Sequence, residues 1–212
     1  GDDRLYGEAG NDSLIGNQGA DIMDGGDGSD LYMIDAADTV TDSGTGEGDF
    51  DRAQISAAGG LSIAVGHWSG VERISGFVGN DTIDATGADA KQTLDGGGGD
   101  DLLIGGNGHD VLLGGQGNDR LIGGGGHDFL VGGAGADVFV FADGFGRDVI
   151  RDFVRGVDRI DLSGHGMTDD FSDLTVTQWN NFAVIRAEGA NDTILIFDGS
   201  ATNIGAEDFI FA

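Results

Sequence analysis

The stretch GGGGDDLLI GGNGHDVLL GGQGNDRLI GGGGHDFLV GGAGADVFV fills residues 96–140 and decides the fold. It consists of five nine-residue units that follow one another in one register without a gap. The sixth position of every unit is Asp, and the eighth position is Leu or Phe. A fixed period of this kind indicates a solenoid, in which each unit repeats one small supersecondary structure.

The two halves of the unit have different structural preferences. Its last three residues predict a short strand with a single apolar side chain directed inward. The preceding Gly-rich segment cannot continue that strand and predicts a turn. Two units of nine residues then make one flattened coil, so turns eighteen residues apart stack on the same edge. We therefore predict an all-β fold, a parallel β-roll with a row of Asp residues along each edge.

These rows of acidic residues indicate a bound cation. Two carboxylates about 5 Å apart repel each other by about 3 kcal/mol at an effective dielectric constant of 20. A core with one Leu-sized residue per unit is too thin to offset this repulsion along both edges. Carboxylate and carbonyl oxygens are hard ligands that suit Ca²⁺ better than zinc. The alternative is a solenoid whose Asp residues only cap turns, but capping does not require Asp at every ninth position.

The units resemble the G-G-x-G-x-D-x-U-x nonapeptide of the RTX (repeats-in-toxin) family. The resemblance implies that two stacked turns hold each ion through their position-six Asp residues and through alternate carbonyls of positions one to four. It implies roughly five to seven Ca²⁺ ions as cofactors. The metal ligands that it assigns in this part of the chain are Asp81, Gly97, Gly99, Asp101, Gly105, Gly106, Asn107, Gly108, Asp110, Gly114, Gly115, Gln116, Gly117, Asp119, Gly123, Gly125, Asp128, Gly132, Ala134 and Asp137.

An earlier block has the same register, with GEAGNDSLI, GNQGADIMD and GGDGSDLYM beginning at residues 7, 16 and 25. The ligands that the resemblance assigns there are Asp3, Glu8, Gly10, Asp12, Gly16, Gln18, Asp21, Gly25, Asp27 and Asp30. The turn that holds Asp3 is expected to pair with the turn that holds Asp21. The other expected turn pairs begin at residues 7/25, 96/114, 105/123 and 114/132.

Three departures from the pattern affect the expected sites. Gln92 stands where the unit from residue 87 should have its Asp, so this unit is expected to bind weakly or not at all. A two-residue insertion follows the unit that contains Asp81, which leaves its stacking on turn 96 open. Glu8 and Asn17 replace the second Gly of their units, where a side chain can strain the backbone.

We divide the chain into four segments. Residues 1–33 form a first repeat block and residues 76–140 a second one. Between them, residues 34–75 lack the Gly pattern but keep strand-like stretches, and we expect an irregular continuation of the solenoid. Residues 141–212 alternate apolar and polar residues and predict a mostly antiparallel β cap over the open end of the roll. The acidic and then apolar tail, residues 207–212, resembles the C-terminal signal of type I secretion.

Composition limits the partners. A formal charge of −28 disfavours nucleic acid and anionic lipid surfaces, because both are negatively charged. The chain has no Cys, which excludes disulfides and thiolate metal sites, and no apolar run approaches the length of a membrane span. It begins within a repeat, so we expect it to be a segment of a longer, secreted protein.

The expected function is that of a non-catalytic module for calcium-dependent folding and secretion, with the type I exporter as partner and the activity of the protein upstream. H-E-x-x-H and G-x-S-x-G are both missing from the sequence, which disfavours zinc protease and lipase chemistry. The alternative is recognition of an anionic polysaccharide, as by the repeat modules of alginate epimerases, or a part of an adhesin. The polymer would then bind through calcium or through Arg120, Arg147, Arg151 or Arg155.

His109 and His127 occupy position five, one coil apart. We expect them to face solvent; the alternative is a pair that binds a soft metal or senses protons.

Overall fold

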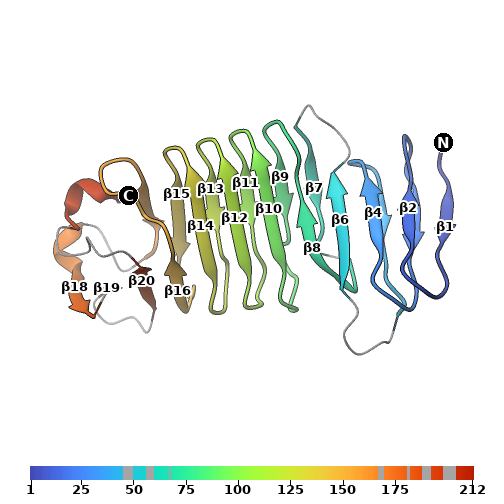
Figure 1. Cartoon of the computed structure of the whole chain (residues 1–212). Coiled ribbons are helices and arrows are strands. Elements are labelled where there is room, and N and C mark those ends of the chain that lie inside the picture. Colours follow the sequence, from blue (N-terminus) through green and yellow to red (C-terminus); the bar gives the residue numbers. More distant parts are fainter. Residues whose placement is uncertain are drawn as a thin grey trace.

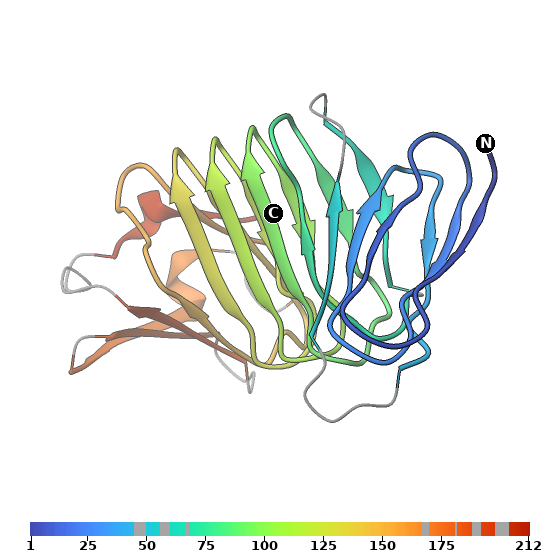
Figure 2. The same ribbon diagram turned by 45° about the vertical axis from the view of Figure 1, so that its right-hand side comes forward.

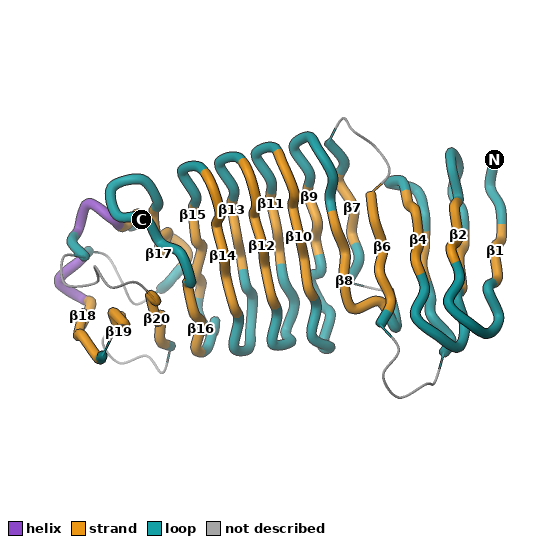
Figure 3. The backbone as a smooth tube through the Cα atoms, viewed as in Figure 1, coloured by secondary structure: helices purple, strands orange, loops and turns teal. Residues whose placement is uncertain are grey.

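The computed structural model describes residues 1–44, 50–55, 60–66, 68–166, 170–180, 182–187, 192–197 and 204–212. Within these residues the chain winds into a solenoid of parallel strands, with coils side by side from the N-terminus to a C-terminal cap (Figure 1). The tube view shows how short strands alternate with turns in every coil (Figure 3). No helix in the described part of the chain is both long and apolar enough to cross a membrane.

One long sheet contains the even-numbered strands of the coils. Its eleven strands lie in the order β18-β19-β20-β16-β14-β12-β10-β8-β6-β4-β2. Their bounds are β2 (Ser13–Ile15), β4 (Leu31–Ile34), β6 (Asp51–Ile55), β8 (Val71–Ser75), β10 (Thr93–Gly98), β12 (Val111–Gln116), β14 (Phe129–Ala134), β16 (Arg147–Ile150), β18 (Leu174–Trp179), β19 (Phe182–Ala187) and β20 (Thr193–Phe197).

The odd-numbered strands other than β19 form two sheets, because pairing stops between β5 and β7 in the described residues. The smaller sheet has the order β1-β3-β5 and the larger has the order β21-β17-β15-β13-β11-β9-β7. Figure 2 shows the flattened shape of the coils that these strands complete. The bounds are β1 (Arg4–Tyr6), β3 (Ile22–Asp24), β5 (Thr39–Val40), β7 (Ser62–Ala64), β9 (Thr82–Asp84), β11 (Leu102–Ile104), β13 (Arg120–Ile122), β15 (Val138–Ala142), β17 (Arg159–Gly164) and β21 (Phe209–Ile210).

The register between coils follows the eighteen-residue period. Leu94 lies opposite Leu112, and Leu112 lies opposite Leu130. On the other face of the coil, Leu103 lies opposite Leu121 in the same way. The prediction of a parallel β-roll is therefore confirmed.

In the regular repeats the core consists mainly of one inward residue from each strand. In the repeats this is the position-eight side chain, and its solvent exposure is 0–4 % in every complete unit. These residues are Leu14, Met23, Tyr32, Ile83, Leu94, Leu103, Leu112, Leu121, Leu130 and Phe139. Stacked apolar residues thus form one narrow column along the solenoid, with a turn at each edge.

The cap is less antiparallel than the sequence predicted. β16 and β17 continue the parallel coils, since they pair with β14 and β15. Among the described residues, antiparallel pairing is limited to the three strands β18, β19 and β20, and β20 joins the solenoid in parallel to β16. The alternating pattern predicted strands correctly, but it does not determine the direction in which they pair.

The C-terminal tail is part of the fold. The 3₁₀ helix η3 (Ala206–Asp208) leads into β21, which pairs in parallel with β17. The guanidinium of Arg155 forms ion pairs with Glu207 and with the fully buried Asp208. A second 3₁₀ helix, η1 (Phe171–Asp173), precedes β18.

Candidate metal centre

Two rows of carboxylates follow the two edges of the solenoid. The odd row lies at the turns that precede the odd-numbered strands of the coils. The even row lies at the turns that precede the even-numbered strands. In the odd row the backbone N–H of Asp101 donates to Oδ1 of Asp119 (2.8 Å), and the N–H of Asp119 donates to Oδ1 of Asp137 (2.9 Å). In the even row the N–H of Asp110 donates to Oδ1 of Asp128 (2.8 Å). Each position-six carboxylate is therefore fixed by the backbone of the coil before it.

Each row connects the repeat blocks to residues outside them. The odd row contains Asp3, Asp21, Asp38, Asp81, Asp101, Asp119, Asp137 and Asp158. The even row contains Asp12, Asp30, Asp51, Glu72, Asp110, Asp128 and Asp148.

The other oxygen, Oδ2, is buried without a hydrogen-bond partner in many of these carboxylates. Among the described residues this holds for Asp12, Asp21, Asp30, Asp101, Asp119, Asp128 and Asp148. Asp119 is only 1 % exposed, so bulk water does not solvate its free oxygen. A buried carboxylate oxygen that lacks a partner destabilises the fold, and a cation beside it would remove that cost.

A turn carbonyl of the next coil lies close to several of these free oxygens. A Cβ atom placed on Gly114, the position-one residue, would overlap both Oδ2 of Asp119 and the carbonyl oxygen of Gly132. The position-two residue also lies against the adjacent coil, because a Cβ on Gly115 would overlap the carbonyl oxygen of Gly97. Carboxylate and carbonyl oxygens thus meet between stacked turns, and this donor set fits Ca²⁺.

Several of the carbonyls assigned as ligands also join the coils. The Gln116 carbonyl accepts from the Gly99 N–H (2.7 Å), and the Gly106 carbonyl accepts from the Gly125 N–H (2.9 Å). The Ala134 carbonyl accepts from the Gly117 N–H in the same manner (2.8 Å). A carbonyl oxygen has two lone pairs, so each retains one for an ion.

Burial strongly perturbs the acids of both rows. Burial, with a smaller contribution from the carboxylates of adjacent coils, raises the pKa of Asp101 and of Asp128 to about 7. Burial and the neighbouring Asp128 and Asp192 raise the pKa of Asp148 to about 8. The pKa of Asp137 rises to about 6, again mainly through burial. Without a cation, these groups favour the protonated form at pH values where free carboxyl groups are ionised.

The first repeat block shows the same stacking. The N–H of Asp3 donates to Oδ1 of Asp21 (2.7 Å), and the N–H of Asp12 donates to Oδ1 of Asp30 (2.8 Å). Both expected turn pairs are therefore brought together. Glu8 and Asn17 have φ values of 76° and 65°, so both adopt the left-handed conformation that the pattern normally reserves for Gly.

The two departures in the second block have different outcomes. Asp81 does stack on turn 96, since its N–H donates to Oδ1 of Asp101 (2.7 Å), and the extra residues lie in a turn closed by the Ala88 N–H and the Ala85 carbonyl. Gln92 keeps its place in the even row through its N–H, which donates to Oδ1 of Asp110 (2.7 Å). It contributes an amide where the repeat has a carboxylate.

Sequence reasoning missed five members of the rows. Asp38, Asp51, Asp148 and Asp158 accept from Asp21, Asp30, Asp128 and Asp137, which lie 17, 21, 20 and 21 residues earlier. Glu72 accepts from Asp51, 21 residues earlier. These separations break the eighteen-residue period and hid the residues from a search by register. An acidic residue two positions before a buried apolar residue is the remaining signal, and all five have it.

Position five carries a second ladder of acceptors on the outer side of the turns. Oδ1 of Asn118 accepts from the N–H of Ala136 (2.9 Å), and Nδ1 of His109 accepts from the N–H of His127 (2.8 Å). The two imidazole rings stack with centroids 4.9 Å apart. Nδ1 of His127 in turn accepts from the Arg147 N–H (3.1 Å), so each ring has its proton on Nε2. The side chains are exposed as expected, but they connect coils, and neither nitrogen of a neutral ring is left as a metal ligand.

The comparisons with known proteins agree with this geometry. The family model of the RTX calcium-binding nonapeptide repeat matches four times, at residues 1–32, 86–121, 104–139 and 113–147. No curated protein sequence matches the chain significantly.

Two of the solved structures that are similar to the chain illustrate the comparison. One is the AlgE6R3 subunit of the Azotobacter vinelandii mannuronan C5-epimerase, at 26% identity and a TM-score of 0.37, with 66% of this chain and 80% of that chain covered. The other is the extracellular lipase LipA from Serratia marcescens, at 16% identity and a TM-score of 0.40. That alignment covers 99% of this chain and 40% of the lipase.

Proposed function

Because the chain carries the RTX calcium-binding nonapeptide repeat, we propose that it is a calcium-dependent folding module of an exported protein, without catalytic activity of its own. The observation that carries this proposal is the set of buried, unpartnered Oδ2 atoms along both rows. Calcium in the stacked turns would supply their missing partner. The ligands are the position-six acids together with the turn carbonyls that the repeat assigns, for roughly five to seven ions.

The mechanism is thermodynamic linkage. An ion that binds the folded chain and not the unfolded chain stabilises the fold by an amount that grows with its concentration. With little calcium, repulsion within a chain of net charge −28 keeps it unfolded. In the millimolar calcium outside the cell, sites with dissociation constants of about 10⁻⁴ to 10⁻³ M fill and the coils form.

Circular dichroism during calcium addition to the chelated protein at pH 7.5 tests this proposal. We expect a coil spectrum to become β-rich between sub-millimolar and millimolar calcium. Magnesium is the control, and we expect it to be ineffective because it keeps its own water shell and requires tighter octahedral geometry. A β-rich spectrum in excess chelator at this pH would refute the proposal.

Export through a type I system is the second part of the proposal. Its support is the lack of Cys, which leaves no disulfide to obstruct an unfolded chain, and the acidic and apolar tail. In the folded chain Glu207 and Asp208 bind Arg155, so the tail would be available to an exporter before folding. Deletion of residues 207–212 should abolish secretion by cells that carry a type I exporter. Arg155→Ala, which leaves the tail sequence intact, should preserve secretion.

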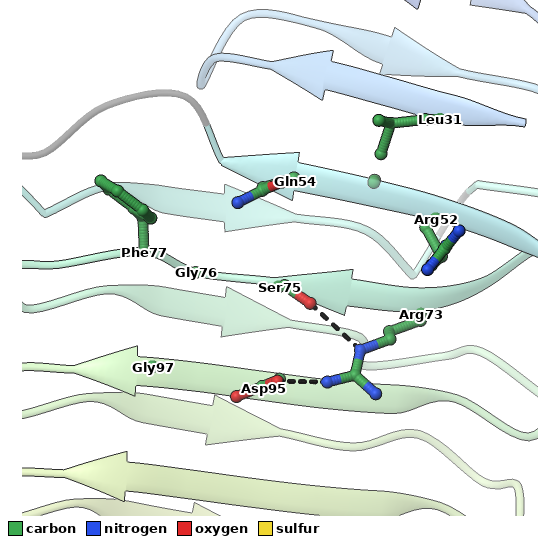
Figure 4. Close-up of a pocket in the computed structure, with 10 residues that line it drawn as sticks. Leu31, Arg52, Gln54, Arg73, Ser75, Gly76, Phe77, Asp95 and Gly97 are labelled. Atoms are coloured by element: carbon green, nitrogen blue, oxygen red, sulfur yellow. Dashed lines mark hydrogen bonds and ion pairs between the residues drawn. The ribbon is translucent and has the colours of Figure 1, made fainter. Parts of the chain in front are cut away.

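A groove on the outer face of the large sheet favours recognition of an anionic polysaccharide as a second function. Its volume is about 470 Å³, and it crosses β4, β6, β8 and β10 (Figure 4). Arg52 and Arg73 lie directly opposite each other on β6 and β8, a like-charge arrangement that an anion between them would stabilise. Arg73 binds Asp95 and Ser75, whereas Arg52 is exposed without a partner in the described residues. Phe77, 51 % exposed, adds an aromatic face on which a sugar ring can stack.

The other arginines considered for this role are mostly engaged within the chain. Arg120 pairs with Asp161 (3.0 Å), Arg155 pairs with the tail, and the Arg151 guanidinium lies 4.1 Å from the centre of the Phe197 ring. The groove around Arg52 is therefore the better candidate.

Calorimetric titration with uronate oligosaccharides in saturating calcium tests this second function. We expect Arg52→Ala to weaken binding about tenfold, which corresponds to about 1.4 kcal/mol. Arg186→Ala removes the same charge from an exposed position on β19 and should have no effect. Equal affinities for the two variants would show that the groove does not bind the polymer.

A further inference from the structure

Asp42 lies beside two acids of the even row, Asp30 and Asp51, just after the first repeat block ends. Asp42 follows β5, and because Val40 lies opposite Met23, Asp42 lies opposite Gly25. Oδ1 of Asp42 accepts from the Gly26 N–H (3.1 Å), which fixes this alignment. Asp42 thus occupies the position-one place of its turn, where the repeats have Gly.

Three carboxylates converge there. Asp30, Asp42 and Asp51 each offer one oxygen, and these oxygens lie within 4.8 Å of one another. They come from the end of one repeat turn, from the segment after β5 and from the first residue of β6. No other group of three acidic or imidazole side chains in the described part of the chain meets this criterion.

Backbone groups hold the three carboxylates in this arrangement. The Asp30 N–H donates to Oδ1 of Asp51 (2.6 Å), and the Gly44 N–H donates to Oδ2 of Asp42 (3.1 Å). Asp30 and Asp51 are each only 1 % exposed. Oδ2 of Asp30 is buried and has no hydrogen-bond partner. It lies so close to Gly25 that a Cβ on that residue would overlap it. This free oxygen is a second sign of a ligand, independent of the clustering of acids.

The dimensions fit one ion. Oxygens bound to Ca²⁺ lie at about 2.3–2.6 Å from the metal, so ligands on opposite sides of it are about 5 Å apart. Separations within 4.8 Å therefore fit a single coordination sphere. No ion pair between any of these three acids and a Lys or Arg occurs in the described residues, so a metal is the available counter-charge.

We propose that Asp30, Asp42 and Asp51 form a calcium site of higher affinity than the sites between regular repeats. A regular site has two carboxylates, and the affinity of calcium sites rises with the number of charged ligands and with their rigidity. The ion would connect β4 to β6, where the nonapeptide turn is absent from the sequence. The inference rests on the proposed function only for the identity of the ion.

Calorimetric titration of the whole chain with Ca²⁺ at pH 7.5 tests the site. We expect one ion to bind the native sequence at least tenfold more tightly than the others. Asp42→Asn should reduce the affinity of this one site about tenfold or more, because a charged ligand becomes neutral, and should leave the number of weaker sites unchanged. Asp89→Asn is the matched control: Asp89 is exposed, and its Oδ1 accepts only from the Asn107 side chain, so the tight site should persist.

A second variant and a second probe keep the test decisive. Asp42→Gly restores the residue that repeat turns have at this position and should behave like Asp42→Asn. Terbium emission excited through nearby aromatic rings should show the same loss, since the Tyr32 hydroxyl lies 3.4 Å from Oδ1 of Asp42. If calcium folds every variant alike and Asp42→Asn binds like Asp89→Asn, the three-carboxylate site is refuted while the proposed function stands. If the native chain binds no calcium at all, both are refuted.

Discussion

The regular stack, residues 96–140, and the interrupted stretch, residues 34–95, build the same coil with different turns. In the regular stack each turn is a Gly-rich nonapeptide, and each position-six Asp accepts from the coil before it. In the interrupted stretch most of the turns lack this sequence, yet β6 still pairs with both β4 and β8. Asp38 and Asp51 still accept from the preceding coil.

The nonapeptide combines two roles, the pairing of strands and the close stacking of turns, and the two regions differ in the second. Strand pairing and an acceptor before each strand need only an acidic residue and a short apolar strand. Close stacking of turns needs Gly, because carbonyl oxygens of adjacent coils occupy the space of a side chain. Only the second role provides carbonyl ligands at a regular spacing.

The largest expected effect concerns pH in the absence of calcium. Burial raises the pKa of the row acids, to about 7 at Asp101 and about 8 at Asp148, so the unfolded chain loses these protons at lower pH than the folded chain. Their stabilising contribution is complete below the ordinary carboxyl range near pH 4 and is lost as pH rises through about 6 to 8. We therefore expect the chelated protein to be β-rich near pH 4.5 and unfolded at pH 8 by circular dichroism.

With saturating calcium the fold should persist across that range, because the ions replace the protons. Binding at pH 7 should release protons, which a titration in buffers of different ionisation enthalpy detects. Chelated protein with the same β content at both pH values would contradict the assignment of the buried acids.

The second-largest expected difference between the two regions is the loss of stability when one residue of a row is replaced. Asp119 belongs to two turn pairs, so Asp119→Ala should eliminate two ions and destabilise the fold by about 5 kcal/mol at calcium 100-fold above the dissociation constant. Gln92→Ala, in the interrupted stretch, should change stability by less than about 1 kcal/mol and leave the ion count unchanged. Calcium titration and urea unfolding measure both, and equal losses would show that the rows are misassigned.

Glycine substitutions should show the same contrast on a smaller scale. Gly115 has a φ of 113°, and a Cβ there would overlap the Gly97 carbonyl, so Gly115→Ala should destabilise the fold by about 3 kcal/mol. Gly87 in the interrupted stretch has a φ of 89° but open space around it, so Gly87→Ala should cost only about 1 kcal/mol of strain. Urea unfolding in calcium compares the pair, and similar losses would mean that the turns are not closely stacked.

The smallest expected effect is at position five. His109→Ala removes the acceptor of the His127 N–H and should destabilise the regular stack by about 1 kcal/mol. His109→Asn keeps an acceptor, as Asn118 does in the odd-side turns, and should be nearly neutral. In the interrupted stretch Lys91 occupies this position without an acceptor, so Lys91→Asn should stabilise slightly. Thermal unfolding in calcium resolves the series, and a loss in His109→Asn equal to that in His109→Ala would exclude the acceptor role.

The sequence by itself determined the class of fold, the coil of two units, the inward column of position-eight residues and the acids at position six. This was possible because a strict period places the same residue types at the same positions of every unit. The places of Asp119 and Leu121 in the fold then follow from their positions in the repeat. Only the tertiary structure decided the members that lie out of register. Asp51 and Asp148 reach the rows through insertions whose length no local rule specifies, and Asp42 reaches its partners through strand pairing.

The same limit applies to the cap and to position five. Alternating residues identify a strand, but the direction in which β20 meets β16 and β19 depends on contacts far apart in the chain. His109 was expected to face solvent, with metal binding or proton sensing as the alternative, and its role as a backbone acceptor was missed because the N–H that donates to it belongs to the next coil. Period and composition are local properties, whereas partners across coils exist only once the solenoid is wound.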